Sequence, residues 1–139
     1  MTTVIEDNEL NTELQELYLK SKEWISDLDF QAEGLLFLRK LFNRNLSRLV
    51  EDDCFELIAQ ITINAVKIEQ VNSDLKTKIA DFLHTFECLM IQPDIRLELS
   101  LVETHNKLSA ELHTIHDKYE LFKESIFDVT KPKLKESKR

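Results

Sequence analysis

The stretch CFELIAQITINAVKIEQVNSDLKTKIADFLHTFECL, which runs from Cys54 to Leu89, decides the fold. Its apolar residues recur at alternating spacings of four and three, a pattern typical of a long helix packed as in a coiled coil. The seam positions are Cys54, Ile58, Ile61, Ala65, Ile68, Asn72, Leu75, Ile79, Phe82, Phe86 and Leu89. Only Asn72 among them is polar. The stretch therefore predicts a helix over residues 54–91.

Two further seams of the same kind flank this stretch. They predict one helix over residues 9–50 and another over residues 94–129. The first seam contains Leu10, Leu14, Leu17, Ser21, Trp24, Leu28, Gln31, Leu35, Leu38, Phe42, Asn45 and Leu49. The second contains Leu101, His105, Leu108, Leu112, Ile115, Tyr119, Phe122, Ile126 and Val129. The connections are short, so we predict an all-α, elongated antiparallel three-helix bundle with coiled-coil-like packing.

Composition supports one helical domain over residues 1–130. The chain has 139 residues with one glycine and two prolines, too few turn residues for a sheet. The whole chain has a net charge of −8. Residues 131–139 carry five basic groups and one acidic group, so residues 1–130 carry a net charge of −12. An acidic body repels phosphate backbones, so no nucleic-acid partner is expected for the folded part. Residues 131–139 are predicted to form a disordered basic tail.

Localisation is predicted to be cytoplasmic, without a membrane partner. The longest unbroken apolar run is Leu35–Leu38, far too short to span a bilayer, and the acidic N-terminus lacks the pattern of a secretory signal. Cys54 and Cys88 would lie about 50 Å apart on one continuous helix, so they cannot pair within the chain. Two free thiols suit a reducing compartment.

Gln31, Asn72 and His105 are polar residues at seam positions. Antiparallel packing places Gln31 level with Asn72, which predicts a buried polar layer in which the two amides face each other or share a water. Such a layer fixes helix register, or alternatively binds a polar ligand. His105 is predicted to be a core histidine satisfied by a neighbouring group, with a ligand-binding role as the alternative.

Nothing in the sequence indicates an enzyme, a cofactor or a metal site. No seam position carries Asp or Glu, as a metal-binding bundle requires. The spacings Asp81-x-x-His84 and His113-x-x-His116 suit a helix, but His84 and His113 fall on outer faces. Phosphate-binding glycine loops and Cys-x-x-Cys pairs are absent from the sequence.

A second apolar stripe on the first helix is the main candidate for function. Phe30, Gly34, Phe37 and Leu41 repeat at spacings of four, three and four, rotated well away from the seam. Either the third helix or the N-terminal segment covers the stripe, or the stripe is an interface for a second copy or a helical partner. Gly34 would let another helix approach closely.

The segment from Glu23 to Leu38 resembles a family of small, uncharacterised bacterial helical-bundle proteins. The resemblance rests on Trp24, Leu28 and Phe30, followed by an acidic residue and a further apolar turn. It implies a long helical hairpin or bundle and no particular activity.

These observations predict a non-enzymatic scaffold or interaction protein. It forms a homo-oligomer, such as a dimer, or docks a helical protein through Phe30, Gly34, Phe37 and Leu41 of the first helix. The alternative is a bundle that binds a small molecule or a metal at the Gln31 and Asn72 layer and at His105. A third hypothesis gives the basic tail a surface-tethering role.

Overall fold

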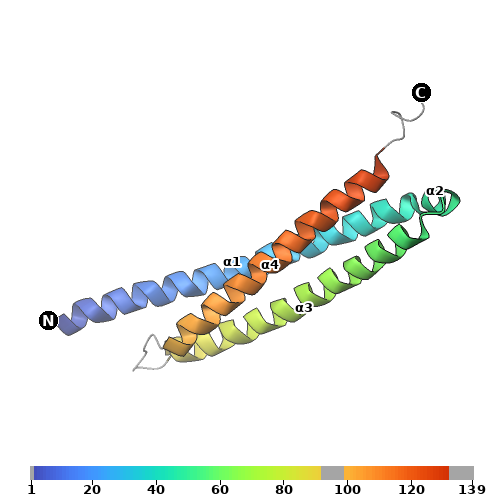
Figure 1. Cartoon of the computed structure of the whole chain (residues 1–139). Helices are drawn as coiled ribbons and strands as arrows, with labels where there is room; N and C mark the ends of the chain where they lie inside the picture. Colours follow the sequence, from blue (N-terminus) through green and yellow to red (C-terminus); the bar gives the residue numbers. More distant parts are fainter. Residues whose placement is uncertain (1, 92–98, 132–139) are drawn as a thin grey trace.

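The computed structural model describes the backbone of residues 2–91 and 99–131 and the side chains of residues 12–88 and 100–131. Four helices pack against one another: α1 (Thr2–Arg44), α2 (Leu46–Glu51), α3 (Phe55–Ile91) and α4 (Leu99–Thr130). The three long helices lie along one another in an elongated molecule, with α3 running opposite to α1 and α4 (Figure 1). The predicted all-α class is confirmed, and the described residues contain no strand.

The core lies where the three predicted seams meet. The buried seam residues of α3 are Ile61, Ala65, Ile68, Asn72, Leu75, Ile79, Phe82 and Phe86. Each of the three long helices contacts the other two, so the α3 seam is enclosed by α1 and α4. Each large apolar side chain buried there contributes about 1.5–3 kcal/mol relative to exposure. Burial of the seams is therefore what holds the helices side by side.

The first predicted helix is interrupted, because α1 ends at Arg44 and the short α2 follows. At Asn45 the backbone leaves helical geometry, with φ −101° and ψ 1°. The side-chain Nδ2 of Asn45 donates to the Leu41 carbonyl at 2.9 Å, while its backbone N–H donates to Phe42 instead. The side chain thus takes the acceptor that a continuous helix would give to the backbone. The expected unbroken helix over residues 9–50 is wrong at this point.

The turn between α2 and α3 is closed by a pair of backbone hydrogen bonds. Cys54 N–H donates to Leu49 at 2.9 Å, and Asp53 N–H donates to Val50 at 3.1 Å. This pattern is the Schellman motif, in which the residue after the helix adopts a left-handed conformation. Asp53 is that residue, with φ 58°. It therefore ends α2.

The outer boundaries also differ from the prediction. α1 already begins at Thr2, which is possible because residues 2–8 contain neither glycine nor proline. α4 is described from Leu99, so the predicted start at residue 94 lies outside the described residues. The predicted tail lies outside them too, apart from Lys131.

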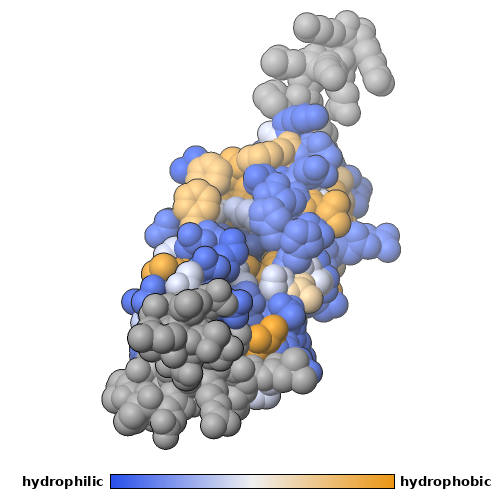
Figure 2. All heavy atoms as spheres, turned by 90° about the vertical axis from the view of Figure 1, so that its left-hand side faces the viewer, coloured by the Kyte–Doolittle hydropathy of each residue, from blue (hydrophilic) through white to orange (hydrophobic). Residues whose placement is uncertain are grey.

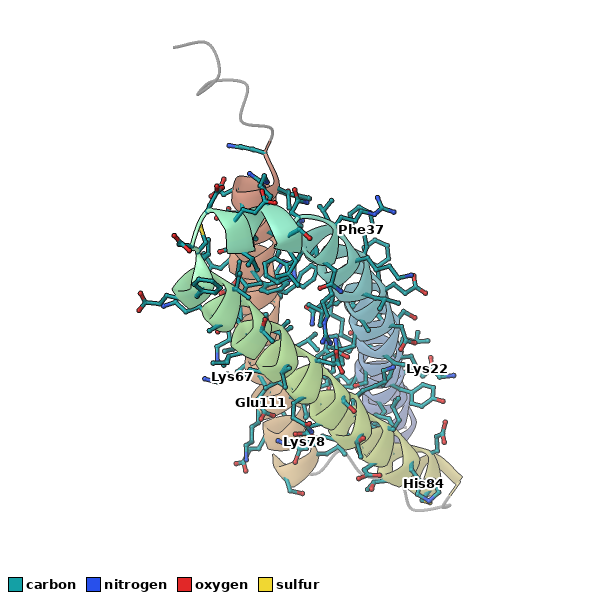
Figure 3. The ribbon with its side chains drawn as sticks, turned by 90° about the vertical axis from the view of Figure 1, so that its right-hand side faces the viewer. Lys22, Phe37, Lys67, Lys78, His84 and Glu111 are labelled. Carbon is teal, nitrogen blue, oxygen red and sulfur yellow. The ribbon has the colours of Figure 1, made fainter. Side chains whose placement is uncertain are left out.

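Polar contacts tie the long helices together at their edges. Asp29 pairs with Lys76 and Arg39 with Glu69 between α1 and α3. Lys78 pairs with Glu111 between α3 and α4 at 3.1 Å, where both side chains extend from neighbouring helices (Figure 3). Such exposed pairs contribute about 0–1 kcal/mol each, so they refine an arrangement that the seams already hold.

Arg48 closes the other end of the bundle. Its guanidinium group donates to the carbonyl of Val129 in the last turn of α4 and also contacts the side chain of Asn45. A cation is favoured at a helix C-terminus, where carbonyl groups lack partners within the helix. Arg48 of α2 is therefore connected to α4, because its guanidinium group provides a hydrogen-bond donor to a carbonyl group at the C-terminal end of α4.

We predict that Asp53→Gly stabilises the protein by about 0.5–1 kcal/mol. Glycine adopts the left-handed conformation without the steric cost that any side chain carries. Urea unfolding followed by circular dichroism measures the change. The matched control is Asp52→Gly, because Asp52 has φ −86° and gains nothing from glycine. Equal effects at both positions would contradict the explanation.

Candidate functional site

The second stripe of α1 is divided by the fold into covered and uncovered positions. Phe30 and Phe37 are 76% and 59% exposed. They are seven residues apart, two helical turns, and so share one side of α1. Figure 3 shows Phe37 on the side of α1 that faces away from α3. Leu41 is half-buried and packs against the core.

Gly34, the fourth member of the stripe, faces α4 of the same chain. A Cβ atom built on Gly34 would overlap the hydroxyl of Tyr119. The glycine therefore makes room for a tyrosine within the molecule. Tyr119 is half-buried, and this burial raises the pKa of its phenol, with a smaller opposing effect of Lys123. Gly34 thus admits an internal neighbour at the place where the sequence suggested a partner helix.

The remaining candidate surface is consequently narrower than the sequence suggested. It consists of Phe30 and Phe37 together with two charged residues, Glu33 between them and Lys40 after them. We call these four residues the α1 outer face. All four side chains are exposed. Figure 2 shows apolar surface emerging in separate places among hydrophilic side chains on the face that it draws.

The polar layer is buried, but its hydrogen bonds differ from the expected pair. Asn72 is 5% exposed, and its Nδ2 donates to the backbone carbonyl of Leu28 on α1 at 3.0 Å. Gln31 is 7% exposed, and its Nε2 has no hydrogen-bond partner. The predicted amide-to-amide pair is therefore wrong. The Leu28 carbonyl accepts the hydrogen bond from Asn72 with a second lone pair, and the Gln31 amide is left with an unsatisfied donor.

His105 belongs to a row of aromatic rings that crosses the bundle. Its ring lies 4.5 Å from that of Trp24 and 6.2 Å from that of Phe82, measured between centroids. Phe82 contacts Phe86 at 5.8 Å, and Phe86 contacts Tyr18 at 5.7 Å. The row joins α1, α3 and α4 through tilted and edge-on contacts between rings.

Protonation of His105 is opposed by its surroundings. Burial lowers the pKa of the imidazole, and the nearby positive charge of Lys20 acts in the same direction, while the Asn106 side chain acts against them. The Nε2 atom is buried without a hydrogen-bond partner. A neutral ring suits the stack against Trp24. The Asn106 side chain hydrogen-bonds to His105, whereas Nε2 is left without a partner, so the predicted satisfaction of this histidine by a neighbouring group is incomplete.

Metal-binding and thiol chemistry have little support in the described part of the chain. No group of three or more His, Cys, Asp or Glu side chains is gathered there closely enough to hold a metal ion. Cys54 and Cys88 are both free thiols, and Cys88 Sγ lies 3.9 Å from His84 Nε2 on the exposed side of α3. One thiol and one imidazole make an incomplete ligand set.

Sequence reasoning missed two features of the surface. One is a groove between α1 and α4 to which His113, His116 and Tyr119 contribute. The other is a set of exposed apolar residues, Phe55, Ile63 and Val66, on α3. With Ala59 they repeat at spacings of four, four and three, a signal that a search for second stripes on every helix would have found. The groove depends on tertiary packing and has no such signal.

Comparisons with protein-family models, with curated proteins and with solved structures find no match to this chain. They do not bear on the resemblance of Glu23–Leu38 to small bacterial helical bundles, which stays a prediction. Within the described residues, no helix combines the length and the apolar character needed to cross a membrane.

We predict that His105 makes the protein less stable in mild acid. The folded state keeps the pKa of His105 below its usual value of 6.5. Between that folded pKa and 6.5 the unfolded chain binds the proton and the folded chain does not, so stability falls as the pH drops through this window. His105→Phe keeps the aromatic stack and should flatten this part of the dependence.

The measurement is the free energy of unfolding by urea at pH 7 and at pH 5. The matched control is His113→Phe, an exposed position on the same helix, which should leave the pH dependence as it is in the wild type. A pH dependence that survives His105→Phe would assign the effect to other groups.

Proposed function

We propose that the chain is a non-enzymatic interaction protein: an elongated antiparallel three-helix bundle with coiled-coil-like packing that pairs with a second copy through the α1 outer face. The observation that carries the proposal is the exposure of Phe30 and Phe37 on one side of α1. Burial of each ring on association is worth about 1.5–3 kcal/mol. Other helical proteins are the second class of partner for the same surface.

The charges beside the rings favour a second copy as the occupant. Glu33 lies four residues before Phe37 and Lys40 lies three after it, on the same flank of the helix. Neither has an ion-pair partner among the described residues. In an antiparallel pair with Phe37 of both copies at the two-fold axis, Glu33 of each copy lies beside Lys40 of the other. One surface thereby complements itself, as an isologous interface requires.

We predict that Phe30→Ser combined with Phe37→Ser weakens the pair at least tenfold. The loss of apolar burial exceeds the roughly 1.4 kcal/mol that corresponds to one factor of ten. Light scattering at several concentrations should show the wild type approaching twice the chain mass of 16.4 kDa and the variant remaining at the chain mass. Circular dichroism checks that helicity is retained.

The matched control for that variant is Phe55→Ser with Phe127→Ser, which removes two rings of 58% and 44% exposure from α3 and α4. This control should keep the wild-type mass. A wild type that stays at the chain mass at every concentration would exclude pairing with a second copy.

Exchange of charges separates the two classes of partner. Glu33→Lys places like charges together at both symmetric contacts, and the double variant Glu33→Lys, Lys40→Glu restores opposite charges there. For a second copy, the mass should therefore fall with the single change and recover with the double change. Another protein at this surface would not restore binding in the double variant, because its own charges are unchanged.

A further inference from the structure

A groove of about 560 Å³ runs between α1 and α4 beside the α1 outer face. Apolar side chains of both helices, among them Trp24, Leu28 and Leu112, border it together with Gln31. Trp24 is only 3% exposed, so it forms part of the floor. The lining of the groove is therefore partly apolar and partly polar, and a ligand in it would contact two helices at once.

Gln31 contributes a buried donor without a hydrogen-bond partner to this lining. The side chain is 93% buried by the fold, and its Nε2 lacks any hydrogen-bond partner. A buried donor without an acceptor costs stability that a leucine at the same seam position would not cost. Gln31 lines the groove, although its Nε2 atom is itself buried. Binding therefore requires the amide to rotate so that the donor meets an acceptor in the groove. An acceptor placed there would satisfy the donor.

The charges along the groove restrict the kind of molecule that fits. Lys20 and Lys123 contribute two positive charges, and Asp27 and Glu120 contribute two negative charges. Lys123 is already paired with Glu120 at 3.1 Å, and Lys20 lies 3.7 Å from Glu23. The fixed charges therefore balance, and the lysines are occupied. A strongly anionic or cationic ligand therefore gains little electrostatic attraction in this groove. A neutral ligand loses no binding energy by lacking a charge.

We propose that this groove binds a small, neutral, flat apolar molecule whose carbonyl oxygen accepts a hydrogen bond from Gln31 Nε2. The flat body lies along the apolar floor, and the carbonyl satisfies the buried donor. The site goes beyond the proposed pairing of two copies and does not rest on it, because α1 and α4 of a single chain form the groove.

The full chain can be titrated with prodan, a neutral naphthyl ketone whose emission reports an apolar environment. Trp24 is the only tryptophan, so energy transfer from it to the probe reports binding close to Trp24, and the Gln31→Leu variant assigns that binding to this groove. We expect saturable binding of one probe per chain. Gln31→Leu should raise the probe Kd at least fivefold while the urea midpoint stays the same or rises. If Gln31→Leu binds the probe more weakly and is at least as stable as the wild type, the Gln31 donor serves ligand binding and not folding.

The matched control is Gln70→Leu, the same substitution on the exposed surface of α3, which should leave the probe Kd unchanged.

A second experiment needs no variant: a dimethylaminonaphthalene without the ketone should bind the wild type at least fivefold more weakly than prodan. Equal binding of the two probes, or equal binding by wild type and Gln31→Leu, would overturn the proposal. Tighter binding of the anionic anilinonaphthalene sulfonate would overturn the neutral assignment. Phe37→Ser alone separates this site from pairing, because Phe37 belongs to the α1 outer face but does not line the groove: it should lower the mass measured by light scattering and leave the probe Kd unchanged.

Discussion

Burial of the α3 seam between α1 and α4 is the constraint on which the rest of this structure depends. α3 offers a continuous row of apolar side chains, and ion pairs such as Lys78–Glu111 are too exposed to replace what that row contributes. The row is interrupted once, by Asn72, and the interruption is resolved across the bundle by the Leu28 carbonyl. This bond is possible at only one alignment of α1 and α3, so it favours a single register. The seams supply the stability, and Asn72 contributes to the alignment.

That alignment determines which other side chains are covered by a neighbouring helix and which remain exposed. With α4 seated on α1, Tyr119 occupies the space beside Gly34, and Leu41 packs against the core. Phe30 and Phe37 belong to the same sequence stripe but remain outside this contact. The same seating leaves the groove beside Gln31 and leaves its amide donor unfilled. Both functional proposals therefore originate from one packing event, and Phe30 belongs to both surfaces.

The ends of the bundle show how local chemistry modifies a periodic pattern. Asn45 diverts a helix carbonyl to its own side chain and ends α1, and Asp53 accepts a left-handed backbone and ends α2. Periodicity alone predicted one helix across this region, because Asn45 and Leu49 both continue the seam. Hydrogen bonds from short polar side chains compete with the backbone ladder, and apolar spacing carries no information about that competition.

The sequence by itself determined the helical class, the residues of the three seams, and the burial of Gln31 and Asn72. These follow from spacing, because a side chain's position around a helix is set by its residue number. Only the tertiary structure decided that Gly34 receives Tyr119, that Asn72 bonds to a backbone carbonyl, and that a groove lies beside Gln31. Each of these depends on the offset and rotation of one helix against another. Many side chains share in setting those quantities, so no single pattern along the chain records them.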